Sequence, residues 1–435
     1  MSRTTNYNDM LNEHLAFDLL EEEVKKQSYI LDNCTIKKDW VGGTIPVPFK
    51  AGKGGTIIMG GLADTSEIAQ TSYVRGTLTT QKEAYGSLIV HEKDLMLNGK
   101  VSEQSFIRIL PDQLEDLRDV YSQSVSTQLL NGGALTAVTV AGTSGGVISV
   151  SHPERLTIGM RLSFKGAVQT AVGYVKTINI NTGALLIVTT PGGSTGQDLS
   201  DDGAAGTGDI DAADGVYLSN CDAHNFTDVF TQLLPSGVLS GSANLYGKEK
   251  ALYPFLQPIV YNGDTGGAVS DSAEDLLYHL FLTQGRAHKR GAMPKEWVLS
   301  YTNYLALKHY IETTGSSYRI IDTGKDTVNY AGTKKITIGG IDDETVIRVV
   351  RDMPDNLALC WDVKDLEFHT PPDGFFKVLE SPDGNKYYTV RTAGTSSNAG
   401  YSYISDIVLR GEFIHTKPWN TALIYRTVGK TLVTA

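Results

Sequence analysis

Two glycine-rich runs in the chain resemble parts of phosphate-binding motifs. Gly429-Lys430-Thr431 has the ending of a P-loop, in which backbone N–H groups and a lysine hold phosphate oxygens. The motif also needs a glycine five positions before Gly429, where this chain has Ile424. Gly52-Lys53-Gly54-Gly55 has the spacing of neither nucleotide-binding motif. Both runs are therefore interpreted as loops.

A third stretch, Asp209, Asp211 and Asp214, could offer carboxylate oxygens to calcium. An EF-hand loop starting at Asp209 needs glycine at its sixth position and glutamate at its twelfth. The chain has Asp214 and Asn220 there, so a solvated acidic loop is favoured and weak surface calcium binding stays open as the alternative.

Histidine and cysteine give no catalytic or metal-binding spacing. The nine histidines are scattered without an HExxH pair, and His279, His288 and His309 fall on expected helices, where packing or surface roles are favoured. The three cysteines lie far apart without a CxxC pair, which fits a reducing cytoplasm better than a disulfide framework. We therefore expect no catalytic residue, no metal and no cofactor, and a protein that is not an enzyme.

Composition narrows the class of protein further. The chain has 435 residues, 41% of them hydrophobic, which is enough for a sizeable core. Its net charge is −11 and no basic stripe is present, so strong binding to nucleic-acid phosphates is not expected. The N-terminal residues lack the pattern of a signal peptide, and no run of 18 apolar residues predicts a membrane span. The 45 glycines and 21 tyrosines favour a β-rich chain with many turns.

The N-terminal part reads as two extensions that lack a core of their own. Residues 7–28 predict an amphipathic helix with Leu11, Leu15 and Leu19 at helical spacing. Residues 44–94 predict a long glycine-punctuated hairpin, which begins with extended proline-rich chain and ends with a strand at 87–91. Such a hairpin has too few apolar residues to fold alone, so it must lie on something else.

A long helix follows, and it is the strongest helical signal in the chain. Pro111 suits its first turn and Asn131-Gly132-Gly133 suits its end. One face of the expected helix is apolar and consists of Leu110, Leu114, Leu117, Tyr121, Val125 and Leu129. The opposite face carries Arg118, Ser122 and Ser126, which predicts a helix that is covered on one side only.

The rest of the chain divides into segments with different patterns of expected helices, strands and turns. Residues 134–220 alternate short apolar runs with turns, which predicts a small all-β module of about four to six strands. Residues 221–365 alternate helices and strands, including a capping box at Ser272 and Asp275. Two closing strands, Ile407–His415 and Ala422–Val428, are separated by Pro418.

This order of elements resembles the Hong Kong 97-type fold of tailed-bacteriophage major capsid proteins. Three passages carry the resemblance. Residues 109–117 look like the start of a spine helix, and residues 299–308 are similar to an A-domain strand and helix. Residues 411–418 are similar to a late P-domain strand. The resemblance implies an α+β fold with an inserted small all-β domain. Its implied parts are an N-terminal arm (1–43), an E-loop hairpin (44–94), a P-domain part with the spine helix (95–133), the inserted β-rich domain (134–220), an A-domain (221–365) and a return to the P-domain with closing strands (366–435).

The resemblance also implies a function and partners. It implies a major capsid protein that assembles as hexamers and pentamers into an icosahedral head around double-stranded DNA, without sequence-specific DNA binding and without a membrane. Portal, scaffold and decoration proteins are the other implied partners, and the implied location is the virion, after assembly in the bacterial cytoplasm. The residues expected at subunit interfaces are Leu11, Leu15, Leu19, Ile57, Ile58, Met59, Tyr73 and Arg75.

Three other classes of protein stay open at this point. An encapsulin-like shell of a bacterial compartment would have the same fold, although the β insertion and the length argue mildly against it. A surface β-rich adhesin or a tail protein is disfavoured by the missing signal peptide and by the mixed α+β region. A hydrolase is disfavoured because no triad or metal spacing is present.

Overall fold

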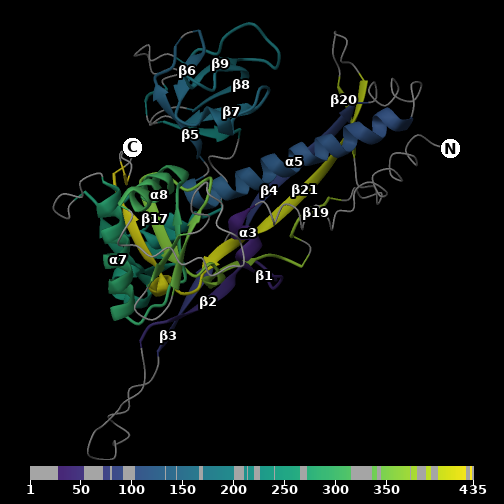
Figure 1. Ribbon diagram of the computed structural model, residues 1–435. Coiled ribbons are helices and arrows are strands. Elements are labelled where there is room, and N and C mark those ends of the chain that lie inside the picture. Colours follow the sequence, from purple (N-terminus) through teal and green to yellow (C-terminus); the bar gives the residue numbers. More distant parts are fainter. Residues whose placement is uncertain are drawn as a thin grey trace, which may run out of the picture.

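A computed structural model gives the arrangement of the chain (Figure 1). It describes residues 28–52, 72–78, 81–91, 103–132, 134–143, 145–165, 170–199, 210–212, 214–219, 226–239, 241–264, 272–314, 336–339, 344–372, 374–379, 388–392, 400–427 and 432–433. These residues form an α+β fold with two six-stranded sheets and a closed barrel. None of the helices in these ranges has the length and apolar character that crossing a membrane requires.

The first six-stranded sheet is built on one long strand, β21 (Gly400–His415). The other strands are β1 (Thr35–Lys37), β4 (Lys82–His91), β18 (Leu366–His369), β19 (Lys377–Val378) and β20 (Tyr388–Thr392). β4 runs antiparallel to β21 from the pair Ser402↔His91 to the pair Gly411↔Lys82. Strand β4 therefore belongs to this sheet, and the single hairpin expected over 44–94 is wrong at its C-terminal end.

A separate, shorter hairpin precedes β4. It consists of β2 (Ile45–Lys50) and β3 (Tyr73–Leu78), paired antiparallel. Side chains alternate across a strand, so Ile45, Val47 and Phe49 are buried while the two prolines between them face solvent. Before this hairpin, α3 (Tyr29–Asn33) leads into β1, which pairs in parallel with β18.

Helix α5 (Glu103–Asn131) lies along the long sheet, beside β4 and β21 (Figure 1). Its 29 residues make a rod of about 43 Å. The helix begins eight residues before Pro111, so the expectation that Pro111 opens it is wrong; the backbone continues through the proline. Burial of Tyr121, Val125 and Leu129 confirms this part of the predicted apolar face.

The opposite face of α5 is covered as well, which corrects the expectation of a one-sided helix. Ser122 and Ser126 are both 4% exposed. The cause is packing on more than one side, because α5 contacts β4, the first barrel strand and the short helix α6 (Val229–Leu233). Small hydroxyl side chains suit such close approach between elements.

The barrel contains β5 (Ala134–Val140), β6 (Val147–Val150), β7 (Arg161–Lys165), β8 (Thr170–Ile178), β9 (Ala184–Val188) and β10 (Gly215–Leu218). It closes in the order β10-β5-β6-β9-β8-β7. Its interior is apolar, with Leu162, Phe164 and Ile187 fully buried. The turn from β8 to β9 places Gly183 at φ +71°, a conformation that glycine adopts readily.

The second sheet has the order β13-β22-β17-β14-β16-β15. These strands are β13 (Ile259–Asn262), β14 (Glu296–Leu299), β15 (Ile336–Gly339), β16 (Glu344–Val349), β17 (Leu357–Trp361) and β22 (Ala422–Tyr425). β22 pairs with β13 and β17. The second of the two predicted closing strands, β22, thus lies in this sheet, whereas β21 lies in the long sheet.

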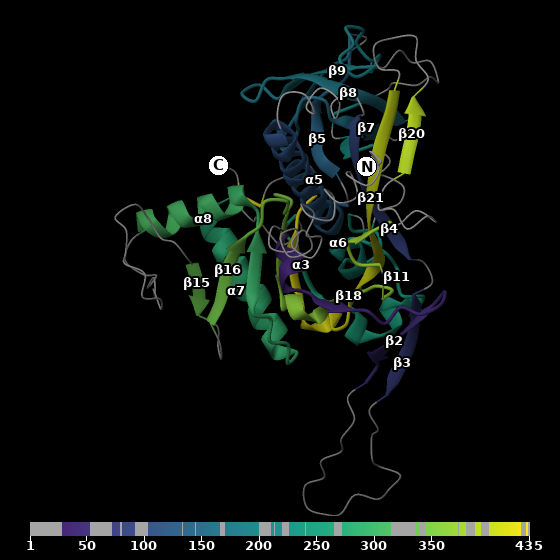
Figure 2. The same ribbon diagram turned by 90° about the vertical axis from the view of Figure 1, so that its right-hand side faces the viewer.

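Two helices accompany the second sheet, α7 (Ala273–Lys289) and α8 (Tyr301–Thr314) (Figure 2). The Ser272 hydroxyl accepts the Asp275 N–H at 3.2 Å and bonds the Asp275 carboxylate at 2.8 Å, which confirms the predicted cap. α7 packs Leu276, Leu277 and Leu280 into a core beside Trp297.

A second core lies between the long sheet and the second sheet, next to the C-terminal half of α5. Phe226, Phe368 and Phe413 meet there with ring centroids 4.6–6.0 Å apart. α6 contributes Val229 and Phe230 to the same core. Residues 226–234 therefore pack in a core that side chains of both sheets share.

Candidate functional site

Most residues of the weak sequence motifs lie outside the described part of the chain. Across the part of the chain that the structure describes, no group of three or more His, Cys, Asp or Glu side chains could hold a metal ion. Asp211 donates its backbone N–H to the Asp214 carboxylate at 2.8 Å, as in a short acidic turn. Asp209, Gly429 and Lys430 lie outside the described residues.

The residues expected at subunit interfaces divide into two groups. Leu11, Leu15, Leu19, Ile57, Ile58 and Met59 lie outside the described residues. Tyr73 and Arg75 are on β3, and both point away from the buried face of the hairpin. Tyr73 is 69% exposed, so its ring is free to meet another surface.

The base of the β2–β3 hairpin is held by an apolar cluster on the body of the subunit. The members of this cluster are Trp40, Ile45, Val47, Phe49, Leu245, Leu256 and Ile414. Because three of them come from β2, the hairpin leaves the body from a fixed root. Pro46 and Pro48 are the exposed residues of β2. Because proline has no backbone N–H to donate, the free edge of this strand is protected against pairing with a further strand.

Tyr246 links this root to the body by several contacts. Its ring stacks on Phe49 with centroids 5.2 Å apart and planes within 3°. Its hydroxyl donates to Gln232 Oε1 at 2.6 Å and accepts the His415 N–H at 2.8 Å. Its carbonyl accepts the Thr77 N–H of β3 at 3.0 Å.

The backbone of Tyr246 is in an unusual conformation for its residue type. Tyr246 and Gly247 connect the short strands β11 (Asn244–Leu245) and β12 (Lys248–Glu249). Their φ angles are +49° and +76°, and a two-residue turn with two positive φ values normally has Asn-Gly at these positions. A left-handed tyrosine costs about 1–2 kcal/mol, so the contacts around it must offset that cost.

A buried polar network continues from Tyr246 to the end of β21. Gln232 donates from Nε2 to the carbonyls of Thr227 and Phe413, each at 3.1 Å. Glu412 accepts the Thr227 and Phe413 N–H groups on Oε1, at 2.9 and 3.1 Å. Burial raises the pKa of the Glu412 carboxyl to about 7. Burial lowers the pKa of the neighbouring His415 to about 4, so this imidazole is neutral at physiological pH.

The long sheet has one covered face and one open face. On the covered face, Gly86 lies so close to Tyr121 of α5 that an added Cβ would be 2.9 Å from its ring. The open face carries Tyr85, Ile89, Tyr388 and Val390, which are 51, 47, 45 and 39% exposed. Ile89 and Tyr388 lie in one row, because both pair with Ile404 of β21.

Polar groups on the open face are paired within the sheet. Arg410 Nε lies 3.0 Å from Glu83 Oε1, and Ser87 donates to Asp406 at 2.5 Å. These pairs hold their charges in fixed positions between the aromatic and aliphatic side chains. A face of this kind can contact another protein surface.

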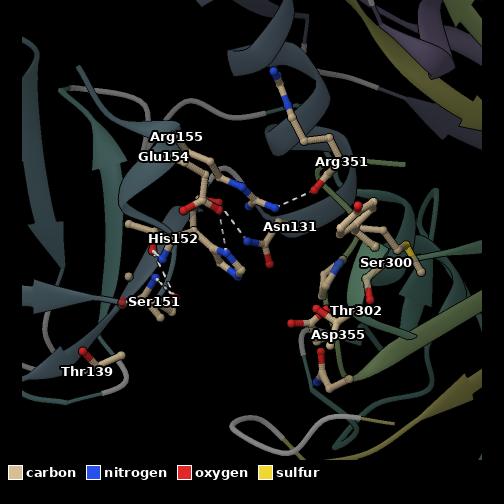
Figure 3. Close-up of a pocket in the computed structure, with 18 of the residues that line it drawn as sticks. Asn131, Thr139, Ser151, His152, Glu154, Arg155, Ser300, Thr302, Arg351 and Asp355 are labelled. Carbon is tan, nitrogen blue, oxygen red and sulfur yellow. Dashed lines mark hydrogen bonds and ion pairs between the residues drawn. The ribbon is translucent and has the colours of Figure 1, made fainter. Parts of the chain in front are cut away.

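A cavity of about 1320 Å³ lies between the barrel and the second sheet (Figure 3). Arg155 crosses from the barrel side and donates to the Arg351 carbonyl at 2.5 Å, while Gln123 of α5 donates to the Arg155 carbonyl at 3.2 Å. Burial lowers the pKa of the Arg155 guanidinium. Arg155 therefore links two parts of the fold through its hydrogen bonds to carbonyl groups.

Sequence reasoning missed Tyr246 and Glu412. Tyr246 gave no signal, because tyrosine is not a turn-forming residue, although the following glycine does mark a turn. Glu412 did leave a signal, since it is an acidic residue directly before the apolar pair Phe413-Ile414 near the end of β21. A charge at such a position predicts a buried, hydrogen-bonded group.

Comparison with known proteins finds likenesses in structure alone. No family model matches the chain, and no curated protein matches it. The capsid of cyanophage A-1(L) aligns at 10% identity over 90% of each chain, with a TM-score of 0.46. The capsid of a native GTA particle aligns at 11% identity over 93% of this chain and 89% of the other, with a TM-score of 0.42. The procapsid of satellite phage P4 aligns at 10% identity over 94% and 99%, with a TM-score of 0.37. Because each of these TM-scores is below 0.5, the alignments do not assign a function to this chain.

Proposed function

We propose that this chain is the major capsid protein of a tailed bacteriophage, a shell subunit that binds other copies of itself. The observation that carries the proposal is the open face of the long sheet. α5 covers one face, while the other holds Tyr85, Ile89, Tyr388 and Val390 without a covering element among the described residues. Large apolar side chains gathered on one face of a sheet are characteristic of protein–protein contact.

The second support is the hairpin. β2 and β3 are rooted in the body, yet Tyr73 and Arg75 point away from that root. In the proposal, these two side chains and the open face contact neighbouring subunits. Leu11, Leu15, Leu19, Ile57, Ile58 and Met59 are proposed to contribute to the same contacts.

The parts of the chain are proposed to correspond to a Hong Kong 97-type subunit with an insertion. In this assignment β2–β3 is the E-loop root, α5 is the spine helix, and the long sheet is the P-domain. The second sheet with α7 and α8 is the A-domain, and the barrel is the inserted domain. Hexamers and pentamers of such subunits would form an icosahedral head, with portal, scaffold and decoration proteins as partners.

The charge of the chain suits a container for DNA. A net charge of −11 without a basic stripe gives little affinity for phosphates, so the shell would enclose DNA rather than grip it. Free subunits are expected to show no shift of DNA mobility at physiological salt. Tight, salt-sensitive DNA binding by free subunits would contradict this part of the proposal.

Negative-stain microscopy of purified subunits at high concentration tests the function, with closed isometric shells as the expected result. A variant with residues 53–71 replaced by a short Gly-Ser turn keeps both described strands of the hairpin. It should remain folded and fail to form shells. A subunit that stays monomeric at all concentrations would refute the capsid assignment, and normal shells from the shortened variant would refute the role of the hairpin. An encapsulin-like compartment would also form shells, and expression in bacteria would then give shells that enclose protein cargo.

A further inference from the structure

The backbone conformation of Tyr246 is one that tyrosine rarely adopts, and its type of turn favours another residue at this position. Both central residues of the β11–β12 turn have positive φ, and asparagine suits the first of them better than tyrosine does. Strained residues persist where surrounding contacts hold them, and such sites often have a role beyond folding. The contacts that hold Tyr246 all connect the hairpin with the body.

On the hairpin side, Tyr246 contacts both strands. Its ring lies flat on Phe49 of β2, and its carbonyl accepts the Thr77 N–H of β3. Gly76 allows this approach, since an added Cβ there would be 2.8 Å from the Phe49 ring and 3.0 Å from the Tyr246 Cβ. The glycine in β3 and the tyrosine in the turn are therefore matched to each other.

On the body side, the same residue is fixed through its hydroxyl. Gln232 of α6 accepts its proton, and the His415 N–H at the end of β21 donates to it. The turn itself is fixed by Lys250, which donates from Nζ to the Thr231 and Leu234 carbonyls at 3.0 and 2.7 Å. A displacement of α6 or of the end of β21 would thus be passed directly to the root of the hairpin.

We propose that Tyr246 is a positioning residue that sets the direction in which the β2–β3 hairpin leaves the subunit. Its ring and carbonyl hold the two strands, and its hydroxyl holds the long sheet. The proposal rests on the proposed function for its consequence in assembly, because a hairpin that reaches a neighbour must leave at the correct angle. Its effect on the isolated subunit does not depend on that function.

The decisive variant is Tyr246→Asn, which gives the turn its preferred residue and removes the ring and hydroxyl contacts. Amide hydrogen exchange of isolated subunits should rise about tenfold or more in the segment 73–78, because the ring pair with Phe49 and the two hydroxyl bonds that hold the root of the hairpin are lost. Exchange in 82–91 should stay within about twofold of wild type, since β4 is held by β21 and α5. Tyr246→Phe keeps the stack and loses only the hydroxyl bonds, so its rise should be smaller.

Two further variants keep the test decisive. Gly76→Ala disturbs the same contact from the other side and should raise exchange in 73–78 in the same way. Leu239→Asn is the matched control, because Leu239 also has a left-handed backbone (φ +47°) and is only partly buried against the core that contains Phe226. It should leave exchange in 73–78 unchanged.

The outcomes separate the two proposals. Increased exchange confined to 73–78, together with loss of shells in Tyr246→Asn, supports the positioning role. Wild-type exchange in 73–78 for Tyr246→Asn would overturn it, and so would an equal rise in 82–91, which would indicate a general loss of stability. If wild-type subunits form no shells, the proposed function fails, while the exchange data still decide the role of Tyr246.

Discussion

Replacing Glu412 by glutamine should remove a pH dependence that is built into the core of the long sheet. Both backbone N–H groups that bind Glu412 donate to the same oxygen, Oε1. A glutamine can keep that oxygen in place and direct its amide toward the Thr227 hydroxyl, which lies 3.3 Å from Oε2. The substitution therefore removes the titrating proton while retaining the hydrogen bonds.

The magnitude follows from the pKa of the buried carboxyl. In the folded protein this pKa is raised to about 7 from the ordinary 4.5, because burial disfavours the charged form. Between these two values the folded state binds more protons than the unfolded state, so stability is fully present below pH 4.5 and falls as the pH rises to 7. The total loss is about 3 kcal/mol, at 1.36 kcal/mol for each pH unit.

Urea unfolding of dilute subunits between pH 4 and 8 measures this effect. The difference in unfolding free energy between Glu412→Gln and wild type should grow across pH 4.5–7 and reach about 3 kcal/mol in favour of the variant at pH 8. Glu249→Gln is the control, because it removes a carboxyl that is exposed. A flat difference for Glu412→Gln would show that the buried carboxyl does not titrate in this range.

Three further effects should be measurable by urea unfolding. Burial lowers the pKa of His415 to about 4, so the free energy of unfolding should fall as the pH drops from 6.5 toward 4. His415→Asn should lack this acid sensitivity. A variant whose free energy of unfolding depends on pH as steeply as that of wild type would contradict the prediction. Ser272→Ala removes the cap of α7 and should cost about 1 kcal/mol, whereas Ser272→Thr should cost much less. Phe368→Ala should cost about 3–5 kcal/mol, because its ring is fully buried among Phe226, Phe375 and Phe413; a cost below about 1 kcal/mol would mean that this core is loosely packed.

Local patterns in the sequence predicted many single elements correctly. β21 ends at the predicted His415 and β22 begins at the predicted Ala422, because Pro418 interrupts the chain between the two strands. The start of α7 was predicted from Ser272 and Asp275, whose hydrogen bonds act within one helical turn. Such signals are readable because the interacting residues are near each other in the chain.

Pairing between distant segments was not predictable in this way. β4 pairs with β21 and β22 with β13, and nothing in the alternation of a strand specifies its partner. The candidate interface was predicted only as far as Tyr73 and Arg75 lie on an exposed face, while their contacts with another subunit remain a prediction. The role of Tyr246 was hidden because it depends on a close approach to Gly76 and Phe49 that only the folded chain creates.

The position of β22 has a consequence for the biosynthesis of the subunit. β13 pairs only with β22 among the described strands, and β17 has β22 on one side. A ribosome that has made β13 and β17 but not residues 422–425 therefore carries a sheet with two unsatisfied edges. Such non-local pairing delays folding until late in translation. An incompletely synthesised chain therefore lacks a finished second sheet, and under the proposed function such a chain would be excluded from assembly.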